Sequence, residues 1–499
     1  MLTFTPVLFV LGILGLCLLR AFVKKTRYPP GPKGLPFLGN IFSLPTTKTW
    51  KYFELLSHKY GSIVRLSLAG NDLIILSDPR DAEELLGRRS WNYSSRKPLV
   101  YAGKYQSNNK RLVLLEYGDS LKKQRTAFHQ MLQPRVVGAY ESIQEIESAK
   151  LVHDMLVRSE DSTRNCKRFS ASLVFHLSYG KRLDDDDQDL VAIGNVLENF
   201  VRDTYPGAHL VDSLPILDYL PGFCAPWRSE ARRKHDVEMK LYQRLVLEVK
   251  EKMDNGDIGL ECFAGRLWDQ KTELGLDLEE LSYVAGSAFE AGTDTTTGTL
   301  QWFLMAMVLY PNTMMKAQAE IDALLGSDGS SMPSFAHIND LPYCIAVAKE
   351  VFRWAPAAPG GFPHYSGNDD EYKGYKHHNE SEFPNPYEFI PERFIRDGNF
   401  KEHDPLTEGH YGFGFGSTED RRKCPGQYLG AKSIWIGLTR LLWGFHIGPQ
   451  CNRNGLSIPV NPDNCTSGMT SKPLDFPLVI TVRSANHART IEREWELNK

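Results

Sequence analysis

The sequence lacks the excess of positive charge that nucleic-acid-binding proteins carry. Its formal net charge is −3, and charged residues make up 24% of its 499 residues. This balance gives no reason to expect a DNA or RNA partner. The eight cysteines, at positions 17, 166, 224, 262, 344, 424, 451 and 465, show no CxxC pairing. That pattern argues against a disulfide framework or a structural zinc site and favours reduced thiols in a cytosolic compartment.

Long apolar runs are also scarce, with one exception at the N-terminus. Leu2 to Val23 is apolar apart from Arg20, so the run could span a bilayer as an uncleaved helical anchor. Positive charge at Lys24, Lys25 and Arg27 predicts that the body stays on the cytosolic side. The alternative is a cleaved signal peptide with a secreted product. In that case the glycosylation sequons would be usable, and they stand at Asn92, Asn379 and Asn464.

The pattern beyond the anchor predicts a mainly α body with a minor β component. Residues 24–36 are basic and proline-rich, which predicts a stiff hinge between the anchor and a body over 37–499. Ile63–Leu68 and Leu73–Leu76 read as a hairpin joined at Ala69–Asp72. Helical patterns dominate from Arg80 to Met315, and Tyr428–Phe445 predicts a strongly apolar helix. We find no convincing internal repeat.

The strongest local motif surrounds Cys424. It reads Arg421-Arg-Lys-Cys-Pro-Gly426 and follows Phe413-Gly-Phe-Gly416. Glycines let the backbone approach a flat cofactor, and Pro425 suits a first helical turn whose free N–H groups favour a sulfur anion. Arg422 can pair with a carboxylate of such a cofactor. The plainer alternative is that Cys424 is a small buried apolar residue.

A second motif, Phe289-Glu-Ala-Gly-Thr-Asp-Thr-Thr296, lies inside a long helical pattern. Gly292 and the hydroxyl-bearing residues are poor helix formers, so the motif predicts a locally weakened helix. A site that admits dioxygen and feeds it protons needs a gap in the helix, a hydroxyl and an acid, which Gly292, Thr295 and Asp294 can supply. The alternative is a helix cap, because Thr and Asp favour N-caps.

The third motif combines Glu350-Val-Phe-Arg353 with Pro391-Glu-Arg-Phe394. Glu350 and Arg353 share one helix face, and Arg393 can extend the pair into a triad. Alone this motif is weak, because exposed pairs of this kind are common and contribute little.

Taken in this order, the motifs resemble the cytochrome P450 superfamily over essentially the whole chain. The resemblance implies a haem b held by Cys424 as axial iron ligand, with Asp294 and Thr295 as the catalytic proton-delivery pair. It also implies that Glu350, Arg353 and Arg393 form a structural triad. Contacts to the haem propionates are implied for Lys122, Arg125, His364 and Arg422. The segments Leu341-Pro-Tyr343 and Phe362-Pro-His364 are most similar to fungal microsomal members of secondary metabolism.

On this resemblance the chain is a monooxygenase that inserts one oxygen atom of O2 by hydroxylation or epoxidation. The resemblance implies electrons from NADPH through cytochrome P450 reductase, cytochrome b5 as a further partner, and single-pass residence in the endoplasmic reticulum membrane. A basic patch of Lys122, Lys123, Arg421 and Lys423 suits an acidic reductase face, with solubility as the alternative.

Substrate choice is expected from the family's recognition segments, which correspond here to 97–116, 201–223, 283–291, 357–362 and 467–470. Most of their residues are apolar, small or aromatic, which suits a lipophilic substrate such as a terpenoid or polyketide-like product. The alternative is that these stretches are ordinary core and loop.

Three features depart from the family pattern. Leu121 and Lys122 stand where Trp and Arg are usual, a strand after Lys376 is missing, and Ser417–Asp420 interrupts the cysteine loop. They motivate a second hypothesis, a degenerate and inactive haem-binding relative, and misplaced exon boundaries are another explanation. A third hypothesis is a haem-thiolate isomerase or dehydratase, which would be expected to lack an acid and alcohol pair like Asp294 and Thr295.

Overall fold

The computed structural model describes residues 28–184, 187–205, 207–257, 262–372, 383–395, 400, 404–415 and 422–499. The predicted anchor over 2–23 therefore lies outside the described residues, as do Asn379, Lys376 and the segment Ser417–Asp420. None of the described helices is long and apolar enough to cross a membrane. The contacts between residues divide the chain into two compact units.

The fold is mainly helical, as predicted. The longer helices are α2 (Thr49–Tyr60), α5 (Asp119–Leu132), α7 (Glu141–Val157), α8 (Ser162–Tyr179), α9 (Gln188–Asp203), α11 (Pro226–Asp254), α14 (Leu278–Leu309), α15 (Pro311–Leu325), α16 (Pro342–Trp354), α17 (Gln427–Gly444) and α18 (Ala485–Leu497). The shorter ones are α3 (Pro79–Ala82), α4 (Ser90–Tyr93), α6 (Pro134–Val137), α10 (Leu210–Ser213), α12 (Phe263–Asp269) and α13 (Lys271–Leu274). The strands are β1 (Ile63–Leu68), β2 (Asn71–Leu76), β3 (Phe445–Pro449) and β4 (Leu478–Val482).

The smaller unit is built on the predicted hairpin. Strands β1 and β2 pair antiparallel from Ile63 opposite Leu76 to Leu68 opposite Asn71. The turn is therefore the two residues Ala69 and Gly70, both with positive φ, and is shorter than the expected Ala69–Asp72. The proline-rich residues, expected to form a hinge, lie along β1: Arg65 N–H donates to the carbonyl of Pro30. A side chain at Gly31 would collide with the Arg65 carbonyl, so only glycine permits this approach.

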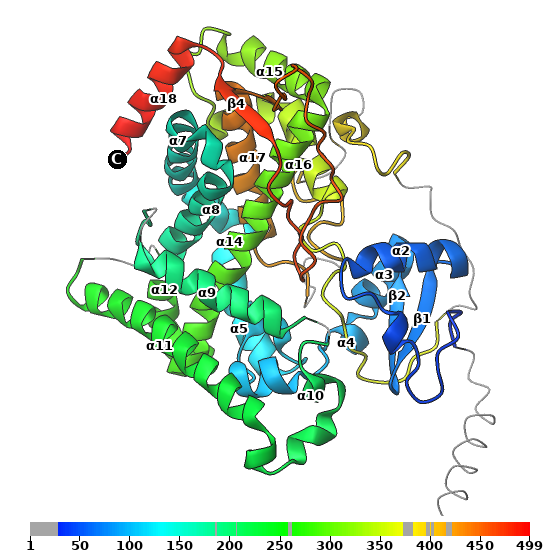
Figure 1. Cartoon of the computed structure of the whole chain (residues 1–499). Coiled ribbons are helices and arrows are strands. Elements are labelled where there is room, and N and C mark those ends of the chain that lie inside the picture. The colour runs from blue at the N-terminus through cyan, green and yellow to red at the C-terminus, as the bar shows by residue number, and fades with distance from the viewer. Residues whose placement is uncertain are drawn as a thin grey trace, which may run out of the picture. The chain divides into compact units, whose positions relative to one another are not determined.

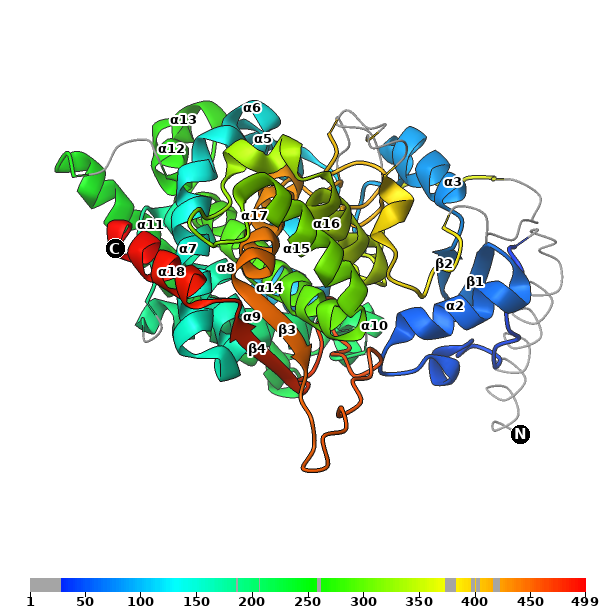
Figure 2. The same cartoon turned by 90° about the horizontal axis from the view of Figure 1, so that it is seen from above.

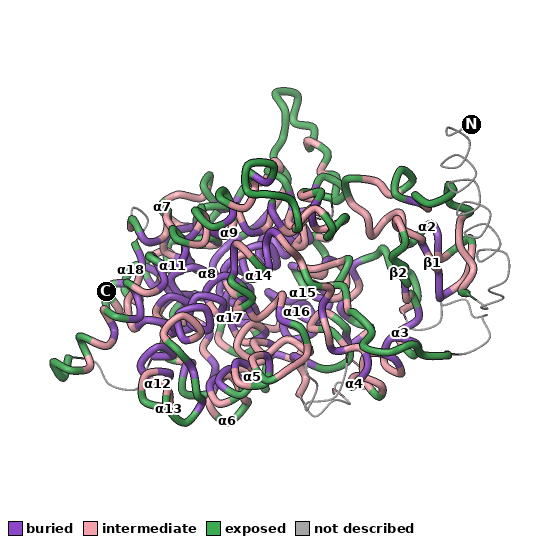
Figure 3. Tube along the Cα trace, turned by 90° about the horizontal axis from the view of Figure 1, so that it is seen from below, coloured by how far each residue is buried: buried purple, intermediate pink, exposed green. Residues whose placement is uncertain are grey.

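The larger unit is organised around α14. This helix packs against α8, α11, α16 and α17, and Figure 1 shows it crossing the helical unit between α8 and the α16–α17 pair. The buried residues concentrate on α8, α14 and α17 (Figure 3). The first turn of α14 is fixed by a capping box, in which Asp277 accepts from the N–H of Glu280 at 2.7 Å and Glu280 accepts from the N–H of Asp277.

The end of α17 continues directly into β3, which pairs antiparallel with β4 (Figure 2). The predicted helix Tyr428–Phe445 matches α17 within one residue at each end. Between Pro359 and Phe389 the described residues form a single bridge, of Tyr365 to Ser95. The same segment bonds to α4, where the carbonyl of Asn92 accepts from the N–H of Gly367.

Candidate active site

Cys424 lies three residues before α17 begins. Its N–H donates to the carbonyl of Phe413 at 3.0 Å, which closes the loop that carries it. Burial raises the pKa of the Cys424 thiol, while a hydrogen bond from the Gly426 N–H and the charges of Arg125 and Lys423 lower it. A half-buried sulfur with a backbone donor and nearby cations can hold a metal ion, which would take the place of the thiol proton. Arg421 lies outside the described residues.

Four basic side chains lie close together beside the loop that carries Cys424. Arg422 donates through Nε to the carbonyl of Ser94 at 2.7 Å and through Nη2 to that of Leu115. Arg125 donates to the carbonyl of Lys423 at 2.8 Å. His364 places Nδ1 2.7 Å from the carbonyl of Tyr93.

The fourth member is Arg96, which the sequence analysis missed. Its Nη1 donates to the carbonyls of Phe362 and Pro363, both at 2.7 Å, and its buried Nε has no hydrogen-bond partner among the described residues. Burial and the charge of Arg422 lower the pKa of Arg96 to about 9. No local motif marks Arg96, so only the spatial cluster identifies it.

The cluster is short of negative charge. Within the described part of the chain, Arg96 and Arg422 bond to backbone carbonyls and pair with no carboxylate. Burial together with Arg96 and Arg422 lowers the pKa of His364 to about 4, and burial together with Arg125 lowers that of Arg422 to about 10. Buried cations that repel one another are stabilised by an anion. The donor set therefore fits a cofactor with carboxylate arms.

Lys122, expected to join this cluster, does not. Its side chain is 59% exposed, and its Nζ lies 3.4 Å from Asp119 in the first turn of α5. Three residues farther along α5, Arg125 turns inward to Lys423 instead. Residues three apart lie on the same face of a helix, so the two side chains differ in direction: Arg125 reaches the cysteine loop, and Lys122 turns back to the start of α5. The structure does not place Lys122 in the cation cluster, and its contact to a haem propionate stays a prediction.

The segment of α14 that carries Asp294 and Thr295 is an unbroken helix. The expected gap is therefore absent from it, and the Thr295 hydroxyl donates to the carbonyl of Ala291 at 2.7 Å. A side chain at Gly292 would come within 2.7 Å of Val174 on α8, so this glycine permits close helix packing. The helix-cap alternative also fails, since α14 begins at Leu278, far upstream.

Asp294 is half-buried, and residues far along the chain hold it. Thr470 Oγ1 donates to Asp294 Oδ2 at 2.5 Å, and Lys472 Nζ lies 2.9 Å from Oδ1. The segment 467–470 is expected to contact substrate, and no local pattern shows that Thr470 also contacts Asp294.

The structure brings Glu350, Arg353 and Arg393 together. Glu350 is fully buried, and its carboxylate accepts from Arg353 at 2.7 and 2.9 Å and from Arg393 at 3.2 Å. Both arginines also donate to backbone carbonyls of the segment 384–388. The arrangement ties α16 to that segment, so the exposed-pair alternative does not apply.

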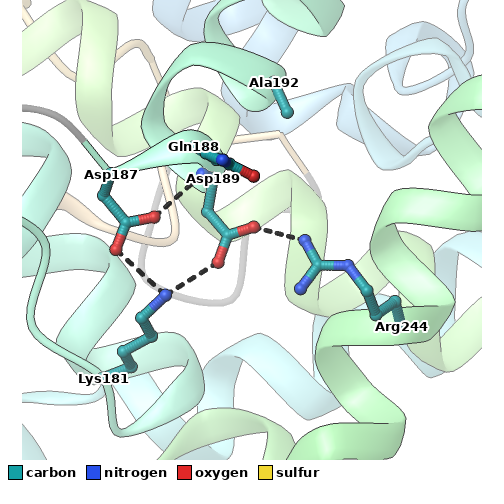
Figure 4. Close-up of a pocket in the computed structure, with 6 residues that line it drawn as sticks. All are labelled: Lys181, Asp187, Gln188, Asp189, Ala192 and Arg244. Atoms are coloured by element: carbon teal, nitrogen blue, oxygen red, sulfur yellow. Dashed lines mark hydrogen bonds and ion pairs between the residues drawn. The ribbon is translucent and has the colours of Figure 1, made fainter.

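A surface pocket of about 710 Å³ lies at the start of α9, away in sequence from the residues described above (Figure 4). Its charges satisfy one another: Lys181 pairs with Asp187 at 3.0 Å and with Asp189 at 2.9 Å, and Arg244 pairs with Asp189. None of the expected site residues lines it.

Comparisons with known proteins agree with this geometry. The cytochrome P450 family model matches residues 29–476, which include parts of both compact units. The cytochrome P450 monooxygenase aneD of Aspergillus aculeatus is 34% identical, covering 96% of this chain and 92% of the relative. A cytochrome P450 monooxygenase of Armillaria gallica is 32% identical over 94% and 92%, and cytochrome P450 monooxygenase 253 of Postia placenta is 34% identical over the same shares.

These matches to monooxygenases extend over nearly the whole chain and do not favour the hypothesis of an inactive relative. The family holds a haem iron through a cysteine thiolate and receives electrons from NADPH through a reductase. The chain therefore belongs to the cytochrome P450 family and is a haem-thiolate monooxygenase.

Proposed function

We propose that this monooxygenase uses Cys424 as the axial ligand of a haem b and oxidises a lipophilic natural product of the terpenoid or polyketide type. The observation that carries the proposal is Cys424 itself, a half-buried thiol beside the N–H of Gly426 and the cations Arg125 and Lys423. When bound, the haem supplies dioxygen activation, which electron donation from the thiolate promotes. The product is a hydroxylated or epoxidised substrate.

Arg96, Arg125, Arg422 and His364 would hold the two propionates of the haem. The buried Nε of Arg96 supports this assignment, since no described residue satisfies it. A propionate would also offset the repulsion that lowers the pKa of His364 and Arg96. In this proposal Lys122 has no part in holding the haem.

Asp294 and Thr295 would hold and pass on protons within α14. The Thr295 hydroxyl donates to the carbonyl of Ala291. It can exchange this partner for a water molecule or for an oxygen atom of a small molecule bound in the site. Asp294 supplies the carboxylate one residue before it. An isomerase or dehydratase would not require this pair.

The substrate proposal rests on the recognition segments. They include the segment 97–116, whose π-helical turn Val100–Gln106 is largely buried, and residues 201–205 and 207–223. Apolar and aromatic side chains predominate in these segments, which suits binding by shape. The relatives' printed names specify no substrate, so the natural-product class remains our proposal.

Membrane association is proposed as well, with residues 2–23 as an anchor in the endoplasmic reticulum membrane and the body facing the cytosol. Large apolar side chains exposed between α10 and α11 support a membrane contact, among them Ile216 at 73%, Tyr219 at 89% and Phe223 at 87%. We also propose cytochrome b5 as a second electron donor. Lys122, Lys123 and Lys423 would contribute to the basic docking face.

Coexpression with an NADPH-dependent reductase, followed by a carbon-monoxide difference spectrum and metabolite profiling, tests this function. We expect a thiolate-type Soret band and an oxygenated product that disappears in Thr295→Ala. A product that persists in Thr295→Ala would contradict the proton-delivery role. An oxygenated product formed equally well without the reductase would contradict the electron route.

A further inference from the structure

The chain between β3 and β4 folds back on itself near its end. Cys465 and Pro473 form an antiparallel bridge, the N–H of Thr466 donates to the carbonyl of Lys472 at 2.9 Å, and the N–H of Lys472 donates to Thr466 Oγ1 at 3.1 Å. We call residues 465–473 the carboxy loop. Figure 2 shows that the chain between β3 and β4 leaves the strand pair as an extended excursion. The carboxy loop is thus closed by its own backbone.

The carboxy loop is anchored on α14 at Ser471. Trp302 Nε1 donates to the carbonyl of Ser471 at 3.1 Å, and the N–H of Ser471 donates to the carbonyl of Ala357 at 2.8 Å. A side chain at Gly298 would come within 3.2 Å of Lys472 Cβ and 3.4 Å of the Ser471 carbonyl. Gly298 therefore lets the backbone of the loop approach α14 one helical turn after Asp294.

From this anchored position, the loop binds both oxygens of one carboxylate. Thr470 Oγ1 donates to Asp294 Oδ2 at 2.5 Å, and Lys472 Nζ lies 2.9 Å from Oδ1. The side chains of Lys472 and Asp294 are 38% and 17% exposed, so water screens this pair less than it would a pair on the open surface. The Asp294 carboxylate therefore points toward the carboxy loop.

The middle of the carboxy loop contacts the C-terminal end of α9. Thr204 Oγ1 lies 3.0 Å from Met469 Sδ, and a side chain at Gly468 would come within 3.2 Å of Val201. Val201, Thr204, Gly468 and Met469 all belong to segments expected to contact substrate. A substrate that displaces Met469 from α9 would therefore move the same loop that holds Asp294.

We propose that Lys472, with Thr470, is a positioning residue that holds the Asp294 carboxylate, and that movement of the carboxy loop frees this carboxylate for proton transfer. The inference rests on the proposed role of Asp294. The freed carboxylate takes up a proton from water and passes it on to the site, so it is unchanged after each transfer. Substrate binding at Met469 and proton delivery at Asp294 are thereby linked through one loop.

Hydrogen–deuterium exchange of the full-length, haem-loaded protein tests the pairing without turnover. We expect Lys472→Met and Asp294→Asn each to accelerate exchange at the amides of Thr466, Ser471 and Lys472 by roughly two- to fivefold, the effect of losing a partly exposed ion pair. The double variant should exchange no faster than the faster single variant, because both substitutions remove the same pair. Lys472→Arg should keep exchange slow.

The matched control is Lys250→Met. Lys250 is 39% exposed and pairs with Asp254 on α11. The variant therefore also removes an ion pair of a partly exposed lysine, but on a helix remote in sequence from the carboxy loop. Its exchange at the three loop amides should equal that of the unchanged protein. Unchanged exchange in Lys472→Met, or fully additive effects in the double variant, would overturn the inference.

The ratio of product formed to NADPH oxidised separates this inference from the proposed function. Lys472→Met should lower the ratio and Lys472→Arg should restore it, once coexpression has identified a product. If Asp294→Asn leaves the ratio unchanged while both variants accelerate loop exchange, the catalytic role of Asp294 fails and the pairing stands. If Asp294→Asn lowers the ratio but Lys472→Met alters neither exchange nor ratio, the inference fails and the proposed function stands.

Discussion

Arg111 Nη2 lies 2.5 Å from Glu238 Oε2, and both side chains are buried. The same guanidinium pairs through Nη1 with Glu290 of α14, whose carboxylate also accepts from the hydroxyl of Tyr242. Burial raises the pKa of Glu238, and Arg111 opposes that rise. Because Arg111 comes from the segment 97–116, its ion pairs tie this expected recognition segment to α11 and α14.

Replacing Arg111 should therefore destabilise the protein strongly. Arg111→Met leaves two buried carboxylates without their cation, and we expect a loss of about 3–5 kcal/mol in the free energy of unfolding. Denaturant unfolding followed by circular dichroism measures this loss. Arg88→Met is the control: Arg88 is 77% exposed beside Glu84, so its loss should change stability by less than about 0.5 kcal/mol. Equal losses for the two variants would show that the buried ion pairs of Arg111 stabilise the fold no more than an exposed pair does.

Gly292→Ala tests the packing of α14 on α8. The added methyl group would lie 2.7 Å from a methyl of Val174, a stiff β-branched side chain. We therefore expect the free energy of unfolding, measured with denaturant, to fall by about 1–3 kcal/mol despite the better helix propensity of alanine. Adding Val174→Ala should recover part of this loss. In Gly194→Ala on α9 the new methyl meets only the flexible end of Lys167, 3.8 Å away. That control should be neutral or more stable by up to about 1 kcal/mol.

Whether a feature of the fold or of the site can be predicted from the sequence depends on how far apart in the chain its contacting residues lie. The hairpin β1–β2 and helix α17 follow from local patterns of apolar and turn residues, and the structure has both. The ion pairs of Glu350 with Arg353 and Arg393 were also inferred, since one is a helical i to i+3 pair and the resemblance supplied the other.

Contacts between distant segments were not predictable from the pattern. Nothing local to Arg96 or Lys472 shows that one joins Arg422 and the other reaches Asp294, because those partners are far away along the chain, 178 residues in the case of Lys472 and Asp294. The structure does not place Lys122 in the cation cluster, since its side chain turns to Asp119. Gly292 was linked to a helical gap, whereas the approach of Val174 accounts for it. Each of these depends on the three-dimensional packing around the residue.

Arg96→Met and Lys122→Met separate the two assignments for the haem propionates. Arg96→Met removes a buried charge-assisted donor, and we expect it to speed the transfer of haem to an excess of apomyoglobin by roughly 10- to 100-fold. Lys122→Met should leave the transfer rate unchanged, because that side chain is exposed and pairs with Asp119. A larger effect from Lys122→Met than from Arg96→Met would reverse our assignment.

Half-buried His176 should make the stability depend on pH. Burial lowers its pKa below the usual value near 6.5, and the charge of Arg182 adds to this while Glu147 opposes it. As the pH falls through 6.5, the unfolded chain binds a proton at this residue before the folded protein does, so the folded state loses stability. His176→Gln should remove this part of the loss. Unfolding measured from pH 8 to pH 5 should thus show a shallower decline in the variant, and parallel curves would contradict the prediction.

The most direct test of the account is the carbon-monoxide difference spectrum of Cys424→Ser beside that of Cys166→Ser. Cys166 is a fully buried thiol within α8, where burial raises its pKa to about 12, so it serves as a matched structural cysteine. The account predicts a thiolate-type Soret band in the unchanged protein and in Cys166→Ser, and its loss in Cys424→Ser. A thiolate-type band that persists in Cys424→Ser would contradict the assignment of Cys424 as the iron ligand.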